Sequence, residues 1–471
     1  MTSKVDLLEL DRRYLWHPYT QMKDFEKDNP LFVDRADGVF LFDAQGRRYY
    51  DTISSWWCIL HGHNHPRIKT AVRNQMDRLE HVHFASTTHE GAIRLAEKLV
   101  SLTPDGLSRV FYSDNGSTAC EVAIKMSFQY WKHMGETGRE GFVSIERGYH
   151  GDTIGAMGLG GVPNFKGPFD ALTFDSYRIP SPYCYRCPYG NRPPGQSPNT
   201  ITKSPNHQIT KSLNCSLECL GLLEKLLADK GNEIAGIILE PLLQAAGGMI
   251  VYPVEYLKRL AELVSHHQVH LILDEVATGF GRTGRMFALE HAGISPDFLC
   301  LSKGLTAGYM PMAATLTTDE VYNAFYADYK EGKTFFHGHT FTGNPLASAA
   351  ALASLEIFEQ ENVLNGLQDK ISVLQSGIKR FGELPWVGDV RGIGMVAALE
   401  LVMDRKTRTA FPSEKRVGWM IYKEGLNKGL ILRPLGDIVY LFLPLSVTID
   451  QIEDILDRSF EVISGLGTVR K

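Results

Sequence analysis

The chain has 471 residues, of which 44% are hydrophobic and 22% are charged, and its formal net charge is −5. This length exceeds what one hydrophobic core supports, so at least two domains are expected, and the slightly acidic balance argues against a nucleic-acid-binding face. Residues 1–10 mix charged residues with leucines, and no run of about 20 apolar residues occurs. We therefore expect no secretory signal, no membrane span and a cytoplasmic location.

The first predicted elements are two antiparallel strands near the start of the chain. The turn Gly46-Arg47-Arg48 separates the apolar residues 40–42 from Tyr49-Tyr50. A short polar turn between two apolar, aromatic-rich runs is typical of a strand pair.

Strands and helices then alternate from about residue 109 to residue 315. The predicted strands are short apolar runs, as expected of strands that are covered on both faces. They are residues 110–112, 142–145, 235–239, 270–273, 298–301 and 312–316. A helix separates most of them, and the clearest begins near Pro253 and ends at His266-His267. This alternation predicts a doubly wound, mostly parallel sheet.

The last part of the chain has a different pattern. Short strands are predicted at residues 396–401, 430–433 and 438–443. A final helix follows, opened by Thr448 with Gln451 at capping-box spacing. Short strands followed by a helix indicate a smaller α+β domain.

The predicted domain organisation follows from these patterns. We expect an α/β protein with a large domain at 76–345 and a smaller α+β domain at 346–471. Residues 1–75 are predicted to form a segment that packs with the small domain. A flexible insertion flanked by cysteines is predicted at 183–219.

The segment Asp114-Asn115-Gly116-Ser117-Thr118 lies between a predicted strand and a predicted helix. The helix is indicated by apolar residues at i, i+3 and i+4 spacing, which include Ala119, Val122, Ala123 and Met126. A helix start offers amide donors and favours an anion, Gly116 permits close approach, and Ser117 adds a hydroxyl. The pattern therefore suggests a phosphate site, although an ordinary helix cap has the same composition.

An amine and a carboxylate follow two of the predicted buried strands. Lys303 comes after residues 298–301, and Asp274 ends the run at 270–273. Open α/β sheets bind ligands at the carboxyl ends of their strands, so both groups are expected to face one crevice. Pyridoxal 5′-phosphate needs a lysine for its aldehyde and an acid for its ring nitrogen. Each residue taken alone is more often a solvated lysine or a helix cap.

Four of the seven cysteines lie close together in sequence. Cys184 and Cys187 form C-x-x-C, and Cys215 and Cys219 form C-x-x-x-C, which is close to the spacing of structural zinc sites. Residues 191–214 between them are polar and contain a near repeat, which is typical of a flexible loop. Ordinary packing on a helix is the simpler explanation of the second pair, so metal binding stays open and no metal is assigned.

Seven short motifs, in this order along the chain, resemble the class III aminotransferases of fold type I. They are Gly116-Ser117, Tyr149-His150-Gly151-Asp152, Glu240-Pro241, Asp274-Glu275, Gly279-Phe280-Gly281-Arg282-Thr283-Gly284, Ser302-Lys303 and Thr340-Phe341. The resemblance covers nearly the whole chain. It implies an α/β fold type I transferase, an aminotransferase activity that depends on pyridoxal 5′-phosphate, and a homodimer with its active site at the subunit interface.

Two further segments, residues 16–22 and Ser54-Ser55-Trp56-Trp57, are similar to one branch of that family. The branch aminates 7-keto-8-aminopelargonate to 7,8-diaminopelargonate in biotin biosynthesis, with S-adenosylmethionine as donor. A version that uses lysine as donor, and an aminotransferase for ω-amino acids or diamines, are the alternatives. A racemase or decarboxylase with the same cofactor, and a zinc-dependent scaffold protein, are the competing classes. The chain departs from the family pattern in the insertion at 183–219 and in His339, where many members have proline.

The resemblance also implies roles for the cofactor-binding residues. Lys303 would bind the cofactor aldehyde and then move a proton, Asp274 would hold the ring nitrogen protonated, and Tyr149 would stack on the ring and touch substrate. Three groups of the phosphate site would be Gly116, Ser117 and Thr340, with His339 beside them. If Thr340 comes from the partner subunit, the enzyme must be a dimer.

The keto substrate has an alkyl chain that ends in a carboxylate, so its pocket needs apolar walls and a cation. Arg433 would bind the carboxylate through two hydrogen bonds. The other residues that the resemblance assigns to substrate binding are aromatic, apart from a glycine that leaves space: Tyr19, Trp56, Trp57, Tyr149, Gly338 and Tyr440.

Overall fold

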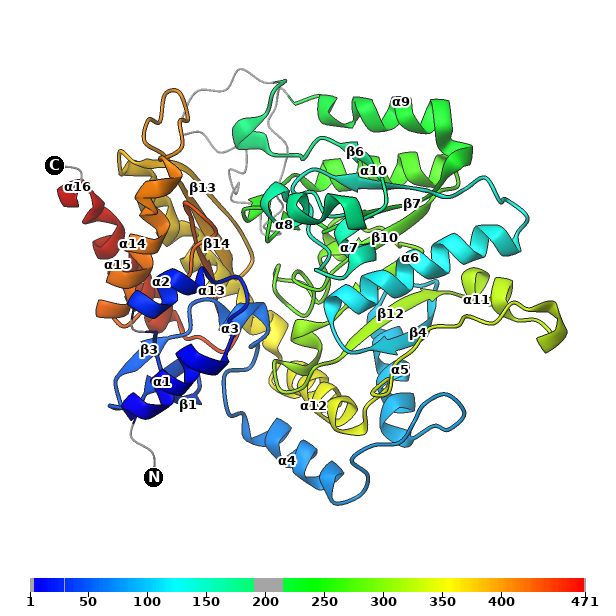
Figure 1. Ribbon diagram of the computed structural model, residues 1–471, viewed down its shortest axis with the longest axis horizontal. Coiled ribbons are helices and arrows are strands. Elements are labelled where there is room, and N and C mark those ends of the chain that lie inside the picture. The colour runs from blue at the N-terminus through cyan, green and yellow to red at the C-terminus, as the bar shows by residue number, and fades with distance from the viewer. Residues whose placement is uncertain (1–3, 29, 190–214, 470–471) are drawn as a thin grey trace.

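The computed structural model describes residues 4–28, 30–189 and 215–469. An α/β part with a seven-stranded sheet lies beside a second part, in which the N-terminal segment and the C-terminal elements pack together (Figure 1). Residues 191–214, predicted as a flexible loop, lie outside the described residues. None of the described helices has the length and the apolarity that crossing a membrane requires.

The large sheet has the strand order β4-β12-β11-β10-β7-β5-β6. Only β12 runs antiparallel to its neighbours, so the sheet is mostly parallel, as predicted. Its strands are β4 (Leu107–Ser113), β5 (Gly141–Ile145), β6 (Tyr177–Ile179), β7 (Ile234–Leu239), β10 (His270–Asp274), β11 (Phe298–Leu301) and β12 (Ala313–Thr318). The six predicted strands are confirmed, and the half-buried edge strand β6 is an addition.

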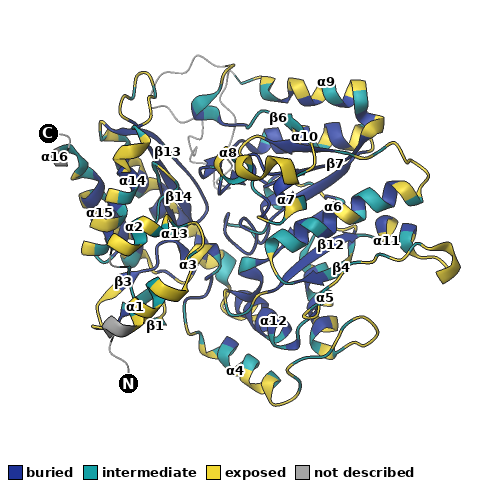
Figure 2. Ribbon diagram, in the orientation of Figure 1, coloured by how far each residue is buried: buried dark blue, intermediate teal, exposed yellow. Residues whose placement is uncertain are grey.

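Helices cover both faces of this sheet, and the central strands are therefore buried throughout (Figure 2). Side chains alternate between two apolar clusters: Ile238 and Ile272 point into one, while Ile237 and Leu271 point into the other. The first cluster lies under α6 (Gly116–His133) and α11 (Asp319–Phe325). The second contains buried residues of α5 (Glu90–Leu102), α10 (Val254–His266) and α12 (Pro345–Gln360).

The C-terminal sheet is antiparallel and has the order β13-β14-β15. The strands are β13 (Val387–Ile393), β14 (Val396–Leu401) and β15 (Ile438–Phe442), and the helices around them are α13 (Val363–Gly377), α14 (Val417–Asn427) and α15 (Ile449–Ser464). The capping box of Thr448 and Gln451 is confirmed at the start of α15.

The strand predicted at 430–433 is wrong. Residue Leu430 makes only an isolated bridge to Tyr50, and β13 takes the place beside β14. The reason is local: Gly394 has φ of 54° and allows a tight turn from β13 into β14, so the hairpin partner lies earlier in the chain.

The N-terminal strands β1 (Val33–Asp37), β2 (Phe40–Asp43) and β3 (Arg48–Tyr50) form a small antiparallel sheet, which confirms the predicted strand pair. Hydrogen bonds join this region to the C-terminal part: the Phe442 amide donates to the Thr52 carbonyl over 2.7 Å, and Ser54 Oγ donates to the Phe442 carbonyl over 2.6 Å. The remaining described α-helices and strands are α1 (Lys4–Tyr14), α2 (Met22–Lys27), α3 (Ser54–Trp57), α4 (Pro66–Met76), α7 (Ile154–Gly158), α8 (Pro163–Lys166), α9 (Gly221–Lys230), α16 (Leu466–Val469), β8 (Leu243–Gln244) and β9 (Ile250–Val251).

Candidate active site

A cavity of about 420 Å³ lies where strands β4, β7, β10 and β11 end. A polar residue lies at or directly after the carboxyl end of each of these strands, at the same edge of the sheet, as the topology requires. The predicted site residues on its wall are Trp57, Gly116, Ser117, Tyr149, Asp274 and Lys303. His150, Glu240 and Cys58 line it as well.

Lys303 and Asp274 therefore face one cavity, as predicted. The Lys303 side chain is half-buried, and its Nζ lies 4.6 Å from the centroid of the Trp57 ring. Burial lowers the pKa of the Lys303 amine, and the charge of Asp274 opposes this shift, as does Glu240 to the extent that it is ionised. The amine is thus more often neutral near pH 8 than an exposed lysine would be.

Asp274 is buried, with 4% of its surface exposed, and both of its oxygens are held. Its Oδ1 accepts from the Val276 amide over 3.1 Å, and its Oδ2 lies 2.8 Å from His150 Nδ1. His150 is as deeply buried as Asp274. A carboxylate fixed in this way presents a constant direction to whatever lies in the cavity.

The N-terminus of α6 forms one end of the cavity. Asn115 and Thr118 cap the helix reciprocally over 3.1 Å in each direction, so the capping groups are occupied with each other. The first-turn amides at Gly116 and Ser117 have no acceptor within the helix, which makes this end suitable for an anion. Packing also requires glycine at position 116, because a Cβ there would lie 2.6 Å from Val276 Cγ1 behind the site.

Tyr149 and Tyr19 meet above the cavity. Their hydroxyls are 3.4 Å apart, and the Tyr19 hydroxyl donates to Asp152 over 2.7 Å. Burial raises the pKa of Tyr19 to about 12 and also raises the pKa of Tyr149, so both phenols stay protonated. The Tyr149 amide donates to Glu240 over 3.1 Å, which fixes the backbone that carries the ring.

The two tryptophans have different surroundings. Trp57 is buried, stacks on Phe442 with 5.5 Å between ring centroids, and donates through Nε1 to the Tyr440 hydroxyl over 3.2 Å. Trp56 is 38% exposed, and the Arg433 guanidinium lies 4.5 Å from its ring centroid. Tyr440 lies behind Trp57 and does not line the cavity.

Arg433 and Tyr19 line a second cavity, of about 760 Å³, between the N-terminal segment and α14. Arg416, Trp419 and Lys423 also line this cavity. Since Tyr19 reaches Tyr149, the two cavities share an aromatic border.

Gly338, His339 and Thr340 do not line the first cavity. They lie in the loop before α12, where Gly338 and Thr340 are exposed and His339 is half-buried. The His339 amide donates to Thr342 Oγ1 over 3.2 Å, which is a contact within the loop itself.

Two residues of the site received no role from the sequence, His150 and Glu240. Both residues belong to motifs on which the family resemblance rests, so a signal was present. The contact between His150 and Asp274, which are 124 positions apart, cannot be read from one sequence. Glu240 accepts from the Tyr149 and Ala245 amides. Burial, and then the charge of Asp274, raises its pKa to about 8. It therefore supports Tyr149 while adding little negative charge near neutral pH.

The family model for aminotransferase class-III matches residues 22–463. The adenosylmethionine-8-amino-7-oxononanoate aminotransferase of Geobacter sulfurreducens is 46% identical over 98% of each chain, and that of Aquifex aeolicus is 44% identical over 95% of this chain and 94% of its own.

Solved structures agree in fold. The enzyme of the same name from Methanocaldococcus jannaschii has a TM-score of 0.90 and 41% identity, and covers 98% of this chain and 99% of its own. An omega transaminase from Pseudomonas jessenii in complex with PMP has a TM-score of 0.89 and 31% identity over 98% of each chain. The predicted α/β fold of type I is thereby confirmed. From the match over nearly its full length, the chain belongs to the class-III aminotransferase family.

Proposed function

We propose that the protein transfers an amino group to 7-keto-8-aminopelargonate (8-amino-7-oxononanoate), giving 7,8-diaminopelargonate in biotin biosynthesis, with pyridoxal 5′-phosphate as cofactor and S-adenosylmethionine as donor. The observation that carries the chemistry is the shared cavity of Lys303 and Asp274. Relatives at 43–46% identity are adenosylmethionine-8-amino-7-oxononanoate aminotransferases, which supports the choice of substrate.

The residues around the cavity fit this cofactor. An amine, a fixed carboxylate and a helix N-terminus lie on the walls of one space of about 420 Å³. The phosphate end is tightly built: a Cβ on Gly151 would lie 1.9 Å from Ser117 Oγ, so only glycine leaves that hydroxyl in place. Ser117 and the amides at Gly116 would hold the phosphate.

When bound, pyridoxal phosphate supplies an aldehyde carbon and a ring that withdraws electrons from the substrate carbon. Asp274 would keep a proton on the ring nitrogen, and His150 is a positioning residue because it lies 2.8 Å from Asp274 Oδ2. Tyr149, whose backbone is fixed by Glu240, would supply an aromatic surface for the ring.

Lys303 has two tasks that both require a neutral amine. It would hold the cofactor through its aldehyde, and its amine would be placed to take up and return a proton at the substrate carbon. Burial lowers its pKa, which raises the neutral fraction at working pH.

The second cavity provides the substrate side. Tyr19 gives an aromatic wall for an alkyl chain, and Arg433, whose guanidinium lies over the Trp56 ring, is placed to bind a terminal carboxylate. Trp56 itself lines neither of the two cavities. The same aromatic border suits the sulfonium of S-adenosylmethionine. Trp57, which donates to the Tyr440 hydroxyl, lines the first cavity.

Arg433→Lys tests the carboxylate role. We expect KM for the keto acid to rise roughly 10- to 100-fold with a smaller change in kcat, because lysine cannot form the paired hydrogen bonds. Arg416→Lys is the matched control, since Arg416 lines the same cavity and pairs with Asp24. Equal effects of the two substitutions on KM would remove Arg433 from this role.

We also propose a homodimer in which Thr340, with His339 beside it and Gly338 leaving room for the substrate chain, completes the partner's site. The supporting observation is that Thr340 is exposed and does not line the cavity of its own chain. The variants Lys303→Ala and Thr340→Ala should each have low activity when the cofactor is limiting. Activity should return when the two are mixed and exchange subunits, because one site of the mixed dimer then has both native residues. A mixture no more active than its parents would show that Thr340 acts in its own chain.

The overall reaction is tested by incubating the holoenzyme with 7-keto-8-aminopelargonate and either S-adenosylmethionine or lysine, and by measuring diaminopelargonate by mass spectrometry. Product with lysine alone would reassign the donor. Turnover of diamines or ω-amino acids without product from either donor would favour the broader alternative, to which the omega transaminases of similar fold belong.

A further inference from the structure

Four cysteines outside the active site face one small cavity. Cys184, Cys187, Cys215 and Cys219 all line a space of about 20 Å³, which is room for a single ion or water. Each of the four is half-buried. Prolines and aromatic rings make up much of the remaining lining, and Ser181, Leu217 and Glu218 complete it.

The four residues come from two segments that are well separated in the chain. Cys184 begins a short 3-10 turn that ends at Arg186, and the Cys187 amide donates back to the Cys184 carbonyl. Cys219 lies in another short 3-10 turn, Glu218–Leu220, ahead of α9, rather than on a long helix. Packing along one helix face therefore does not explain why the two pairs meet.

The sulfur atoms act on one another. The Cys219 thiol lies within electrostatic reach of Cys184, Cys215 and Cys187. The four thiols border one small space with little water, and a cation bound there would replace their protons and stabilise the deprotonated sulfurs.

We infer that these four cysteines together bind one zinc ion. Zinc takes four thiolates in a tetrahedron with Zn–S distances of about 2.3 Å, and C-x-x-C pairs are its common ligands. Soft thiolates without oxygen or nitrogen ligands favour zinc over magnesium or calcium. Four protein ligands leave no open position, so the site is structural.

The ion would draw the ligands inward. Among the described residues, only Cys120, His150 and Asp274 bring three potential ligand atoms within 4.8 Å of one another, and His150 there already holds Asp274. The four cysteine sulfurs would therefore have to move closer together to bind the ion. Closing the four sulfurs around zinc would join the segment of Cys184 and Cys187 to the segment of Cys215 and Cys219 that leads into α9.

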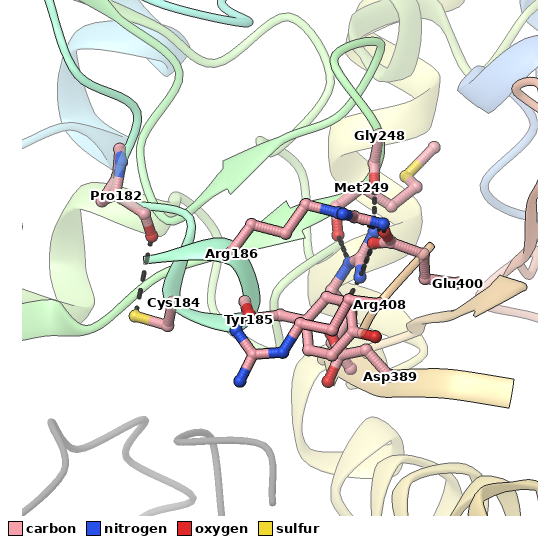
Figure 3. A network of polar contacts seen from close by, with 10 residues as sticks. Pro182, Cys184, Tyr185, Arg186, Gly248, Met249, Asp389, Glu400 and Arg408 are labelled. Carbon is pink, nitrogen blue, oxygen red and sulfur yellow. Dashed lines mark hydrogen bonds and ion pairs between the residues drawn. The ribbon is translucent and has the colours of Figure 1, made fainter. Parts of the chain in front are cut away.

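The turn that carries Cys184 and Cys187 also carries a connection to the C-terminal sheet (Figure 3). Arg186 binds Glu400 over 2.7 Å, and Glu400 in turn lies 3.0 Å from Arg391. Arg391 donates to the carbonyls of Gly248 and Met249 in the α/β part. A zinc ion at the base of this turn would therefore stiffen the junction between the two parts of the molecule.

The test uses the full-length, cofactor-loaded protein prepared under reducing conditions and reconstituted with zinc sulfate. We expect about one zinc per chain by elemental mass spectrometry. Cys187→Ser and Cys215→Ser should each retain less than roughly a tenth of it. Cys58→Ser, which removes a half-buried thiol outside the cluster, is the control for metal content and should keep the zinc.

A second measurement covers the case in which a variant does not fold. The wild-type protein with cobalt substituted for zinc should show the intense visible bands of tetrahedral sulfur coordination. Titration of four thiols with a mercurial reagent should release one zinc ion. Zinc below about a tenth per chain, unchanged zinc in Cys187→Ser, or a disulfide in the reduced preparation would each overturn the assignment. None of these readouts depends on turnover.

Discussion

Lys303→Ala should lower kcat by on the order of 10⁴-fold or more, because one side chain performs both the covalent attachment of the cofactor and the proton transfer. Borohydride should fix the cofactor to the wild-type chain and not to the variant. The measurements are single-turnover kinetics with the amino donor and the mass of the reduced protein.

Lys370→Ala is the matched control for Lys303→Ala. Burial also lowers the pKa of Lys370, but its amine donates to the Leu445 carbonyl and it lines neither large cavity. We expect this variant to keep the borohydride label and its turnover. A Lys303→Ala protein that turns over within about tenfold of wild type would contradict the assignment.

Asp274→Asn should lower kcat by on the order of 10³-fold while the protein still binds pyridoxal phosphate. Asparagine is nearly the same size, but it carries no charge to hold the proton on the ring nitrogen. The loss should appear in kcat and in kcat/KM to a similar extent, as expected for an interaction made in the transition state.

Asp297→Asn provides the comparison for Asp274→Asn. Asp297 is half-buried, and its Oδ2 accepts from the Leu271 amide over 2.7 Å at the opposite end of β10, away from the cavity. This substitution should affect the free energy of unfolding more than turnover. If Asp274→Asn lowers kcat by less than about tenfold, ring protonation does not depend on Asp274.

The sequence predicts the central sheet well, since continuous apolar runs identify strands that are buried on both faces. It predicts the meeting of Lys303 and Asp274 for the same reason, because parallel strands end at one edge. The wrong strand at 430–433 shows the limit of this prediction. An apolar run does not indicate which strand it pairs with, and here β13 pairs with β14 through a local turn.

The parts of the site that the sequence misses depend on contacts between distant residues. His150 meets Asp274 across the sheet edge, and Trp57 separates Tyr440 from the cavity. Neither fact follows from periodicity or spacing. The different surroundings of Trp56 and Trp57 are likewise hidden, because their backbone departs from both regular periods.

That backbone has a consequence for engineering. Residues 54–57 all have positive φ, from 46° at Ser55 to 81° at Trp56, a conformation that glycine adopts freely and tryptophan does not. Holding a large ring there costs on the order of 1 kcal/mol. Trp56→Gly would thus relax the backbone while removing the ring that lies against Arg433, so that losing this contact and keeping thermal tolerance conflict less here than elsewhere.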